Sequence, residues 1–172
     1  DPDTMCLDPK DIEHRITKRT RAIVPVHYCG YPCDMDPIVE IAKRHGVKVI
    51  EDVSHAHGGL YKGRLVGTIG DVGAMSCMSG KSLAIGEGGM LVTNDKEIYQ
   101  RAIAFGHYER TGKDIADNPE LAPYGGLPWG GVKFRMHQLS SAVGRVQLKY
   151  YEGRMATIQR SMNHFWDLLD GA

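Results

Sequence analysis

The stretch TRAIVPVHYCGYPCDMDPIVEIAKRHGVKVIED, residues 20 to 52, decides the fold. It opens on a short apolar and β-branched run, 20 to 27, of the kind that forms a buried strand. Its middle predicts a helix, because Asp36 can cap the first turn, Pro37 suits that turn and Gly46 can end the helix. A second buried strand, 47 to 52, follows directly. Strand, helix and strand within about 30 residues form the βαβ unit of a parallel sheet.

The segments downstream continue the same pattern. Residues 72–78 and 89–95 have the character of strands, and residues 96–105 predict a helix. Residues 106–131 are rich in Gly, Pro and Tyr and show no periodicity, so we expect a long functional loop. Apolar residues recur at helical spacing from about 136 to 169, which predicts one long helix or a broken pair. The expected class is α/β, a doubly wound and mostly parallel sheet flanked by helices.

Composition narrows the classes of function. The chain has 172 residues, enough for a domain with a core, and its 21 basic and 21 acidic residues do not indicate a nucleic-acid or membrane-surface binder. No apolar run is long enough to span a bilayer, and no signal peptide is recognisable. Four scattered cysteines do not form a disulfide framework, so we expect a reducing cytoplasm. Since both ends look cut, we interpret the chain as a piece of a longer protein.

Lys81 stands apart from the other charged residues. It is the one basic residue of SCMSGKSLAIGEGG, 76 to 89, among serines, glycines and small apolar residues. Ligands of α/β sheets gather beyond the carboxyl ends of the strands, and polar residues follow three predicted strand ends. The side chains that we expect to converge in one concavity there are His27, Asp52, His55, His57, Ser76 and Lys81.

A lysine that faces a carboxylate, beside a bed of hydroxyls and glycine amides, suits pyridoxal phosphate. The lysine forms a Schiff base with this cofactor, and the carboxylate keeps the pyridine nitrogen protonated. Hydroxyls and amides hold the phosphate. These residues therefore predict a pyridoxal phosphate site.

The same residues also resemble a nucleotide-binding loop and a metal site. SGKS invites comparison with the phosphate-binding loop of nucleotide hydrolases, but that motif requires Gly where this chain has Met75. The two histidines of HAH, with Asp52 and His27, leave a zinc or manganese site as an alternative. The metal alternative would leave Lys81 and its glycines unexplained.

From Ile23 to Asp95 the sequence resembles the DegT/DnrJ/StrS family of pyridoxal-phosphate-dependent sugar aminotransferases, which have the aspartate aminotransferase fold (fold type I). The motifs that carry the resemblance are PVHYCGYPCDM, EDVSHAHG, YKGRLVGTIGD, SCMSGK and GEGG. Downstream, GGVKFRMHQLSSAVGRVQL is similar to the family's G-x-N-x-RM segment and the helix after it. The resemblance implies that this chain is part of the cofactor-binding large domain.

The resemblance implies a role for each matching residue. Lys81 is the Schiff-base lysine and the base that moves the proton during transfer. Asp52 pairs with the pyridinium nitrogen, and burial of that pair helps to retain the proton. Ser76, five residues before Lys81, binds the cofactor phosphate. His55 takes the place, commonly held by Gln, beside the 3-hydroxyl of the ring.

Four further positions carry expectations of their own. Ser54 matches a small residue that packs against one face of the ring, although simple packing explains it equally well. His57 is expected only to pack or to hydrogen-bond within its turn. Cys29 stands where the family often has Tyr, and Lys133 replaces the usual Asn of G-x-N-x-RM. The last two departures concern contacts to substrate and to cofactor.

The activity that the resemblance implies is transfer of an amino group from glutamate or glutamine to a keto group of a nucleotide-linked sugar or cyclitol. A homodimer is expected, with the active site completed by the neighbouring subunit, and no nucleic acid or membrane as partner. Residues 1–135 would belong to the large domain and residues 136–172 to a helical segment leading toward a small C-terminal domain. This piece alone is therefore expected to be inactive.

Two relatives of different activity share the same motifs. A deoxysugar dehydratase uses the same cofactor but replaces the Schiff-base lysine by histidine, whereas position 81 is lysine here. A silent regulatory homologue would be expected to lose Asp52 or Lys81, and both are present. Transamination is therefore the favoured activity.

Lys133 gives a first testable prediction. In the family the Asn at this position comes from the neighbouring subunit and contacts the cofactor phosphate, and a lysine suits phosphate as a point charge. In the full-length dimer, Lys133→Ala should weaken cofactor affinity by about 1 to 3 kcal/mol, the scale of a lost charge-assisted hydrogen bond, and Lys133→Asn should restore much of it. Titration with pyridoxal phosphate measures this, and an unchanged dissociation constant in Lys133→Ala would contradict the role.

Overall fold

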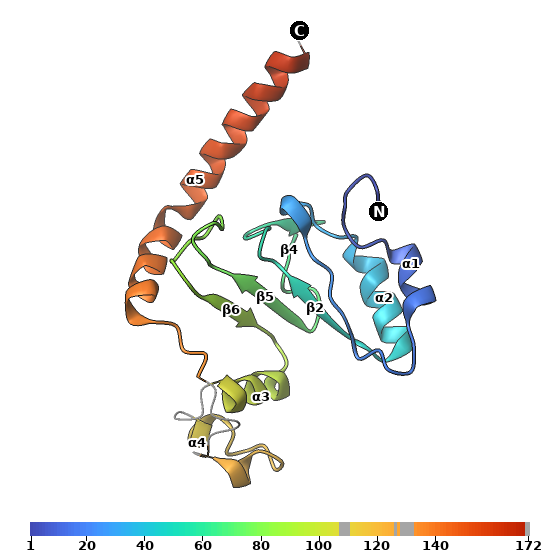
Figure 1. Ribbon diagram of the computed structural model, residues 1–172, viewed down its shortest axis with the longest axis vertical. Coiled ribbons are helices and arrows are strands. Elements are labelled where there is room, and N and C mark those ends of the chain that lie inside the picture. Colours follow the sequence, from blue (N-terminus) through green and yellow to red (C-terminus); the bar gives the residue numbers. More distant parts are fainter. Residues whose placement is uncertain (107–110, 126, 128–132, 171–172) are drawn as a thin grey trace. The chain divides into compact units, whose positions relative to one another are not determined.

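The computed structural model describes residues 1–106, 111–125, 127 and 133–170 (Figure 1). The chain divides into two compact units, and each is described by itself. The first unit comprises Asp1–Ser76 and Gly89–Met136, and the second comprises Cys77–Gly88 and His137–Ala172. None of the helices in the described part of the chain combines the length and the hydropathy that a bilayer crossing requires.

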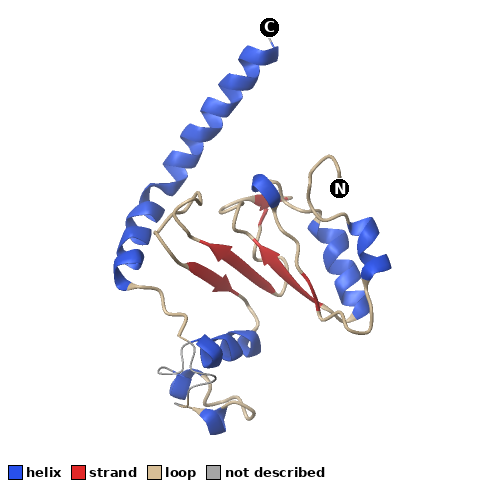
Figure 2. Ribbon diagram, viewed as in Figure 1, coloured by secondary structure: helices blue, strands red, loops and turns tan. Residues whose placement is uncertain are grey.

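A four-stranded sheet, whose longer strands are drawn as arrows in Figure 2, forms the centre of the first unit in the order β1-β2-β5-β6. The strands are β1 (Ala22–Ile23), β2 (Lys48–Asp52), β5 (Val72–Ser76) and β6 (Gly89–Val92). The first three run parallel, and β6 pairs antiparallel with β5. The expected α/β class with a mostly parallel sheet is confirmed. The first strand is shorter than predicted, because Pro25 cannot donate to a ladder; pairing resumes only at the bridge between Val26 and Asp52.

The predicted βαβ unit is present, with α2 (Met35–His45) between β1 and β2. Gly46 ends this helix in the left-handed conformation, with φ of 63°, as expected from the sequence. The prediction that Asp36 caps the helix is wrong, because the N-cap is Asp34. The Asp36 carboxylate instead pairs with the Lys62 ammonium at 2.8 Å and with the Arg64 guanidinium.

These two cations come from a small antiparallel hairpin, β3 (Leu60–Tyr61) and β4 (Arg64–Leu65). The Tyr61 hydroxyl donates to the Asp34 carboxylate and accepts from the Asp36 N–H at 3.3 Å. The hairpin therefore closes the amino end of α2 through Tyr61 as well as through charge.

The core of the first unit lies between α2 and the sheet, with α1 (Pro9–Arg15) lying against α2 (Figure 1). The buried side chains that pack together there include Ile12, Ile23, Met35, Ile38, Ile41, Val49 and Val53. The apolar side of α2 thus covers one face of the parallel sheet.

The remaining elements of the first unit are η1 (Tyr28–Gly30), α3 (Lys96–Gly106), α4 (Thr111–Asp114) and η3 (Ala122–Tyr124). The helix predicted at 96–105 is confirmed by α3. The segment predicted as one long loop also contains the short helix α4 and the turn η3, and buries Ile115 and Leu121 against Ala104. Residues 107–110, 126 and 128–132 of that segment lie outside the described residues.

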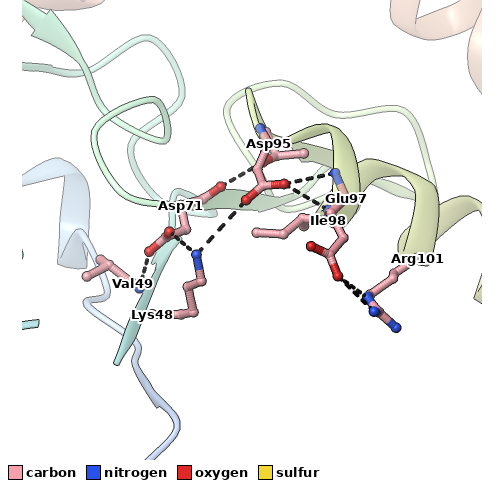
Figure 3. A network of polar contacts seen from close by, with 8 residues as sticks. Lys48, Val49, Asp71, Asp95, Glu97, Ile98 and Arg101 are labelled. Atoms are coloured by element: carbon pink, nitrogen blue, oxygen red, sulfur yellow. Dashed lines mark hydrogen bonds and ion pairs between the residues drawn. The ribbon is translucent and has the colours of Figure 1, made fainter. Parts of the chain in front are cut away.

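Polar contacts fasten the amino end of β2 to the segments that precede β5 and α3 (Figure 3). Lys48 Nζ donates to the Asp71 carboxylate at 2.7 Å, and the same carboxylate accepts from the Val49 N–H at 2.8 Å. Lys48 also lies 4.0 Å from the Asp95 carboxylate, which accepts from the Glu97 N–H at the start of α3. The network fixes the end of the sheet opposite to the carboxyl ends of the parallel strands.

The second unit consists of the segment Cys77–Gly88 folded against α5 (Gln138–Asp170). The apolar periodicity of 136 to 169 left open whether one helix or a broken pair would form, and α5 is one uninterrupted helix of 33 residues. Cys77, Leu83 and Ile85 pack with Tyr151 of α5 to form its small core.

The side chain of Glu51 is completely buried and ties three segments of the first unit together. Its carboxylate accepts a hydrogen bond from the His27 ring at 3.1 Å. It also accepts backbone N–H groups at 2.6 to 2.7 Å, from Gly67, Ile69 and Gly70. Burial raises the pKa of Glu51, but these donors outweigh burial, so that the pKa lies below its ordinary value.

His27 extends this network toward α2. The Cys33 N–H donates to His27 Nδ1 at 3.0 Å, which leaves the ring proton on Nε2, the atom that faces Glu51. The ring is fully buried and therefore links the segment before α2 to the Glu51 carboxylate. His27 was among the side chains expected to converge in the concavity, whereas the structure buries its ring between the Glu51 carboxylate and the Cys33 N–H.

Replacing Glu51 tests the network. Glu51→Gln turns one acceptor oxygen into an amide N–H₂ that faces backbone donors, so the free energy of unfolding should fall by about 3 kcal/mol. Because the folded-state pKa is lowered, the carboxylate's contribution is present above its ordinary value of 4.5 and is lost as pH falls through the folded value. Glu51→Gln should therefore lose less stability than the natural protein between about pH 5 and about pH 3.

Thermal melting of the full-length protein across this pH range measures both effects. Glu40→Gln is the matched control, since Glu40 is exposed on α2 of the same unit. A Glu51→Gln protein that melts like Glu40→Gln at neutral pH would show that the network contributes nothing to stability.

Gly73 gives a second prediction from the fold. A Cβ at this position would lie 2.3 Å from the Gly67 carbonyl oxygen and 2.8 Å from the Gly67 Cα, which are backbone atoms that cannot rotate away. Gly73→Ala should destabilise the protein by about 2 to 3 kcal/mol. Gly153→Ala is the control, because nothing lies within 4 Å of its added Cβ on helix α5, and it should be neutral or stabilising. Equal melting temperatures for the two variants would contradict the prediction.

Candidate active site

Asp52 and Ser76 are the last residues of the neighbouring parallel strands β2 and β5. Both are partly buried. The Asp52 N–H donates to the Pro25 carbonyl at 2.9 Å, and its own carbonyl accepts from the His27 N–H at 3.1 Å. The strand end that presents this carboxylate is thus held by the segment that follows β1.

The turn after β2 orients the Asp52 carboxylate. The Ser54 N–H donates to Asp52 Oδ1 at 2.9 Å, so the side chain is held back over its own turn. The turn itself closes through the Ala56 N–H, which donates to the Val53 carbonyl at 2.9 Å. The Asp52 carboxylate is therefore held in a defined orientation at the end of β2.

The same turn also contacts Ser76. Ser54 Oγ accepts from the Ser76 N–H at 3.0 Å, and the His57 ring lies 2.9 Å from the Ser76 carbonyl oxygen through Nε2. The expectation for His57 was too narrow, since its ring reaches beyond its own turn to the next strand. Ser54, which the sequence left between packing on the cofactor and plain packing, makes two polar contacts within the protein.

His55 is exposed at the same edge of the sheet. Its ring lies 5.6 Å, between centroids, from the ring of Tyr28 in η1, at an interplanar angle of 54°. Cys29 next to it has the left-handed φ of 50°, which turns the loop at this point. Tyr28 was not singled out in the sequence, although its place directly after the predicted strand 20 to 27 was a signal that could have identified it.

Lys81 lies in the second unit, in a looped segment closed by backbone hydrogen bonds. The Cys77 N–H donates to the Gly88 carbonyl at 2.8 Å, and the Lys81 N–H donates to the Met78 carbonyl at 2.9 Å. Lys81 is partly buried. Its expected convergence with Asp52, His55 and Ser76 of the first unit stays a prediction.

Helix α5 supports the lysine segment through residues that the sequence did not single out. The hydroxyl groups of Ser82 and Tyr151 lie 3.1 Å apart, and the Arg154 guanidinium donates to the Ser82 carbonyl. Cys77 is buried beneath the segment, and this burial raises the pKa of its thiol, so the neutral form is favoured. Cys77 thus packs in the small core of the second unit.

Lys133 is exposed in the first unit, between the undescribed residues 128–132 and α5. Its expected contact with a cofactor phosphate across a dimer also stays a prediction.

The alternative of a metal site gains no support from the geometry. His27 is buried against Glu51, and His57 is directed to a backbone carbonyl. Within the described ranges, no three side chains of the types His, Cys, Asp and Glu are grouped so that they could hold a metal ion.

Comparison with known proteins gives the same picture as the motifs. Residues 1–172 match the DegT/DnrJ/EryC1/StrS aminotransferase family. The chain is 40% identical to the GDP-perosamine synthase of Escherichia coli O157:H7, over 87% of the chain and 38% of that protein. It is 38% identical to the L-glutamine:scyllo-inosose aminotransferase of Streptomyces griseus, over 98% of the chain and 40% of that protein.

A solved structure, the aminotransferase from Psychrobacter cryohalolentis, is also similar. It superposes with a TM-score of 0.73 at 40% identity, covering 87% of this chain and 38% of that one. The chain thus spans about two fifths of the length of the relatives that it matches. The aminotransferase fold expected from the motifs is confirmed, and the chain belongs to the DegT/DnrJ/EryC1/StrS aminotransferase family.

Proposed function

We propose that the full-length protein is a pyridoxal-phosphate-dependent aminotransferase, which moves an amino group from glutamate or glutamine to a keto group of a nucleotide-linked sugar or cyclitol. One observation carries the proposal. A carboxylate, Asp52, and a hydroxyl residue, Ser76, end two neighbouring parallel strands and are joined through Ser54. This is the edge of an α/β sheet where ligands bind.

The residues proposed for the site, Lys81 of the second unit included, fit the cofactor by their chemistry. Asp52 offers a carboxylate whose backbone is fixed by the segment after β1, as is required to hold a ring nitrogen. Ser76 offers a hydroxyl suited to a phosphate oxygen, and Lys81 offers the amine that holds the cofactor covalently. His55 offers an imidazole for the 3-hydroxyl of the ring.

The chain's own residues then have distinct tasks. Bound pyridoxal phosphate supplies a ring that withdraws electrons from the carbon that loses its proton. The Asp52 carboxylate holds a proton on the ring nitrogen. Lys81 Nζ would take the proton from the carbon that bears the donor's amino group and would hold it for return during the same transfer. The Ser76 hydroxyl binds the phosphate, so that the ring keeps one orientation.

The names of the relatives support the class of substrate. One is a GDP-perosamine synthase and another is an L-glutamine:scyllo-inosose aminotransferase, so a nucleotide-linked sugar and a cyclitol are both represented. The latter name also supports glutamine as the donor. We further propose a cytoplasmic homodimer in which Lys133 of the neighbouring subunit completes the phosphate site.

Substitution of Lys81 and Asp52 tests the proposal in the full-length protein. Lys81→Ala should remove the visible absorbance of lysine-bound pyridoxal phosphate and, with it, transamination. Asp52→Asn should still bind cofactor but lose activity about 100-fold or more, because the ring nitrogen no longer keeps its proton. Both are measured with a panel of keto sugars and cyclitols, with glutamate or glutamine as donor.

Lys18→Ala is the matched control, since Lys18 is exposed in the turn before β1. It should leave both absorbance and activity unchanged. Full transamination by Lys81→Ala would refute the mechanism, and activity that depends on zinc or manganese but not on pyridoxal phosphate would restore the metal alternative.

A further inference from the structure

In the register of the sheet, strand β2 ends two residues before β5 does. The backbone N–H and C=O of the last β5 residue, Ser76, therefore have no strand partner on that side. The pairing register ends with Asp52 opposite Ala74, and the Val53 N–H still donates to the Ala74 carbonyl at 2.8 Å. In a strand, the N–H and C=O of one residue point to the same side, and alternate residues face the same neighbour. The N–H and C=O of Ser76 therefore point to the side on which β2 has already ended.

Two side chains take the place of the missing strand. Ser54 is the residue that would face Ser76 if the register continued, and it offers its hydroxyl oxygen to the Ser76 N–H at 3.0 Å. His57 Nε2 lies 2.9 Å from the Ser76 carbonyl oxygen, and because a carbonyl only accepts, Nε2 must carry the proton. Both polar groups of the Ser76 backbone are thereby satisfied without a strand partner on that side.

Ser54 also links this position to the carboxylate. Its N–H donates to Asp52 Oδ1 at 2.9 Å while its hydroxyl accepts from Ser76. One residue therefore sets the spacing between a carboxylate and a hydroxyl residue on adjacent strands. In the proposed function these two groups hold opposite ends of one cofactor, the ring nitrogen and the phosphate.

We propose that Ser54 and His57 are positioning residues, which hold Ser76 in place for a phosphate monoester. The proposal rests on the proposed function, in which Ser76 binds the phosphate, and it names the two residues that hold Ser76 in position. Since Ser54 accepts the Ser76 N–H, the group of Ser76 that serves the phosphate is the hydroxyl and not the backbone N–H. Neither Ser54 nor His57 touches the phosphate itself, so both act through Ser76.

The test compares two ligands that differ only in the phosphate, pyridoxal 5'-phosphate and pyridoxal. Their dissociation constants for the full-length protein are measured by titration, and their ratio reports the contribution of the phosphate independently of turnover. His57→Leu and Ser54→Ala should each weaken binding of pyridoxal 5'-phosphate about tenfold, the scale of one hydrogen bond, and leave the binding of pyridoxal within about twofold.

Conservative variants separate positioning from general damage. His57→Gln retains an N–H donor and Ser54→Thr retains a hydroxyl, so both should keep most of the preference for the phosphorylated ligand. If His57→Leu fails to fold, Ser54→Ala and Ser54→Thr carry the same comparison. Equal losses for the two ligands would overturn the proposal, as would a conservative variant that behaves like the apolar one.

A double variant tests whether the effect passes through Ser76. In a Ser76→Ala background, whose phosphate contact is already gone, His57→Leu should cause no further loss of the preference for phosphate. Additive losses would overturn the proposal. If the natural protein binds pyridoxal 5'-phosphate tightly and His57→Leu keeps the full preference, this inference alone fails. If the natural protein binds neither ligand, the proposed function fails with it.

Discussion

The buried carboxylate of Glu51 is the interaction on which the candidate site most depends. It holds the His27 ring on one side and the backbone of the segment 67–70 on the other, and it cannot be solvated, since it is completely buried. Its neighbour Asp52 must point to the opposite face of the sheet, because successive side chains of a strand alternate. Two adjacent carboxylates of one strand thus have separate tasks: Glu51 fixes the strand end, and Asp52 is presented at it.

Most of the fold could be predicted from the sequence, because most of its helices and strands are determined by residues that are close together in the chain. The βαβ unit follows from two β-branched runs and a helix that ends at Gly46, and each of these is determined within a few residues. The errors lie where distant residues decide. The sequence predicted Asp36 as the cap, whereas Asp34 is the N-cap. Both carboxylates bind Tyr61, Lys62 or Arg64 of a hairpin that lies 25 to 28 residues away in the sequence.

The candidate site was predictable in its principal groups but not in its supports. Asp52 and Ser76 were found because a motif and a strand end coincide, and the register of β2 and β5 brings them to the same edge. His57 was assigned no task, because a histidine two residues from His55 gives no sign in sequence of which carbonyl its ring will meet. That partner depends on the offset between two strands of five residues each, whose register places Asp52 opposite Ala74. The apolar runs did not fix this offset, since 72–78 was expected as a strand, whereas β5 ends at Ser76. Lys81 and Lys133 rest on the motifs alone.

The early end of β2 is itself a requirement of the site. If β2 continued, the Val53 carbonyl and the His55 N–H would pair with Ser76, in the same pattern by which the Val53 N–H donates to the Ala74 carbonyl, and the turn that carries Ser54, His55 and His57 would be displaced along the strand. Because β2 ends at Asp52, the backbone N–H and C=O of Ser76 bind the side chains of Ser54 and His57 instead of a strand. The chain can therefore turn after Asp52 while these two hydrogen bonds are formed. The turn can then serve both strands, with Ser54 bound to Asp52 and to Ser76. A carboxylate and a hydroxyl residue are in this way held at a fixed separation by the one residue that lies between them.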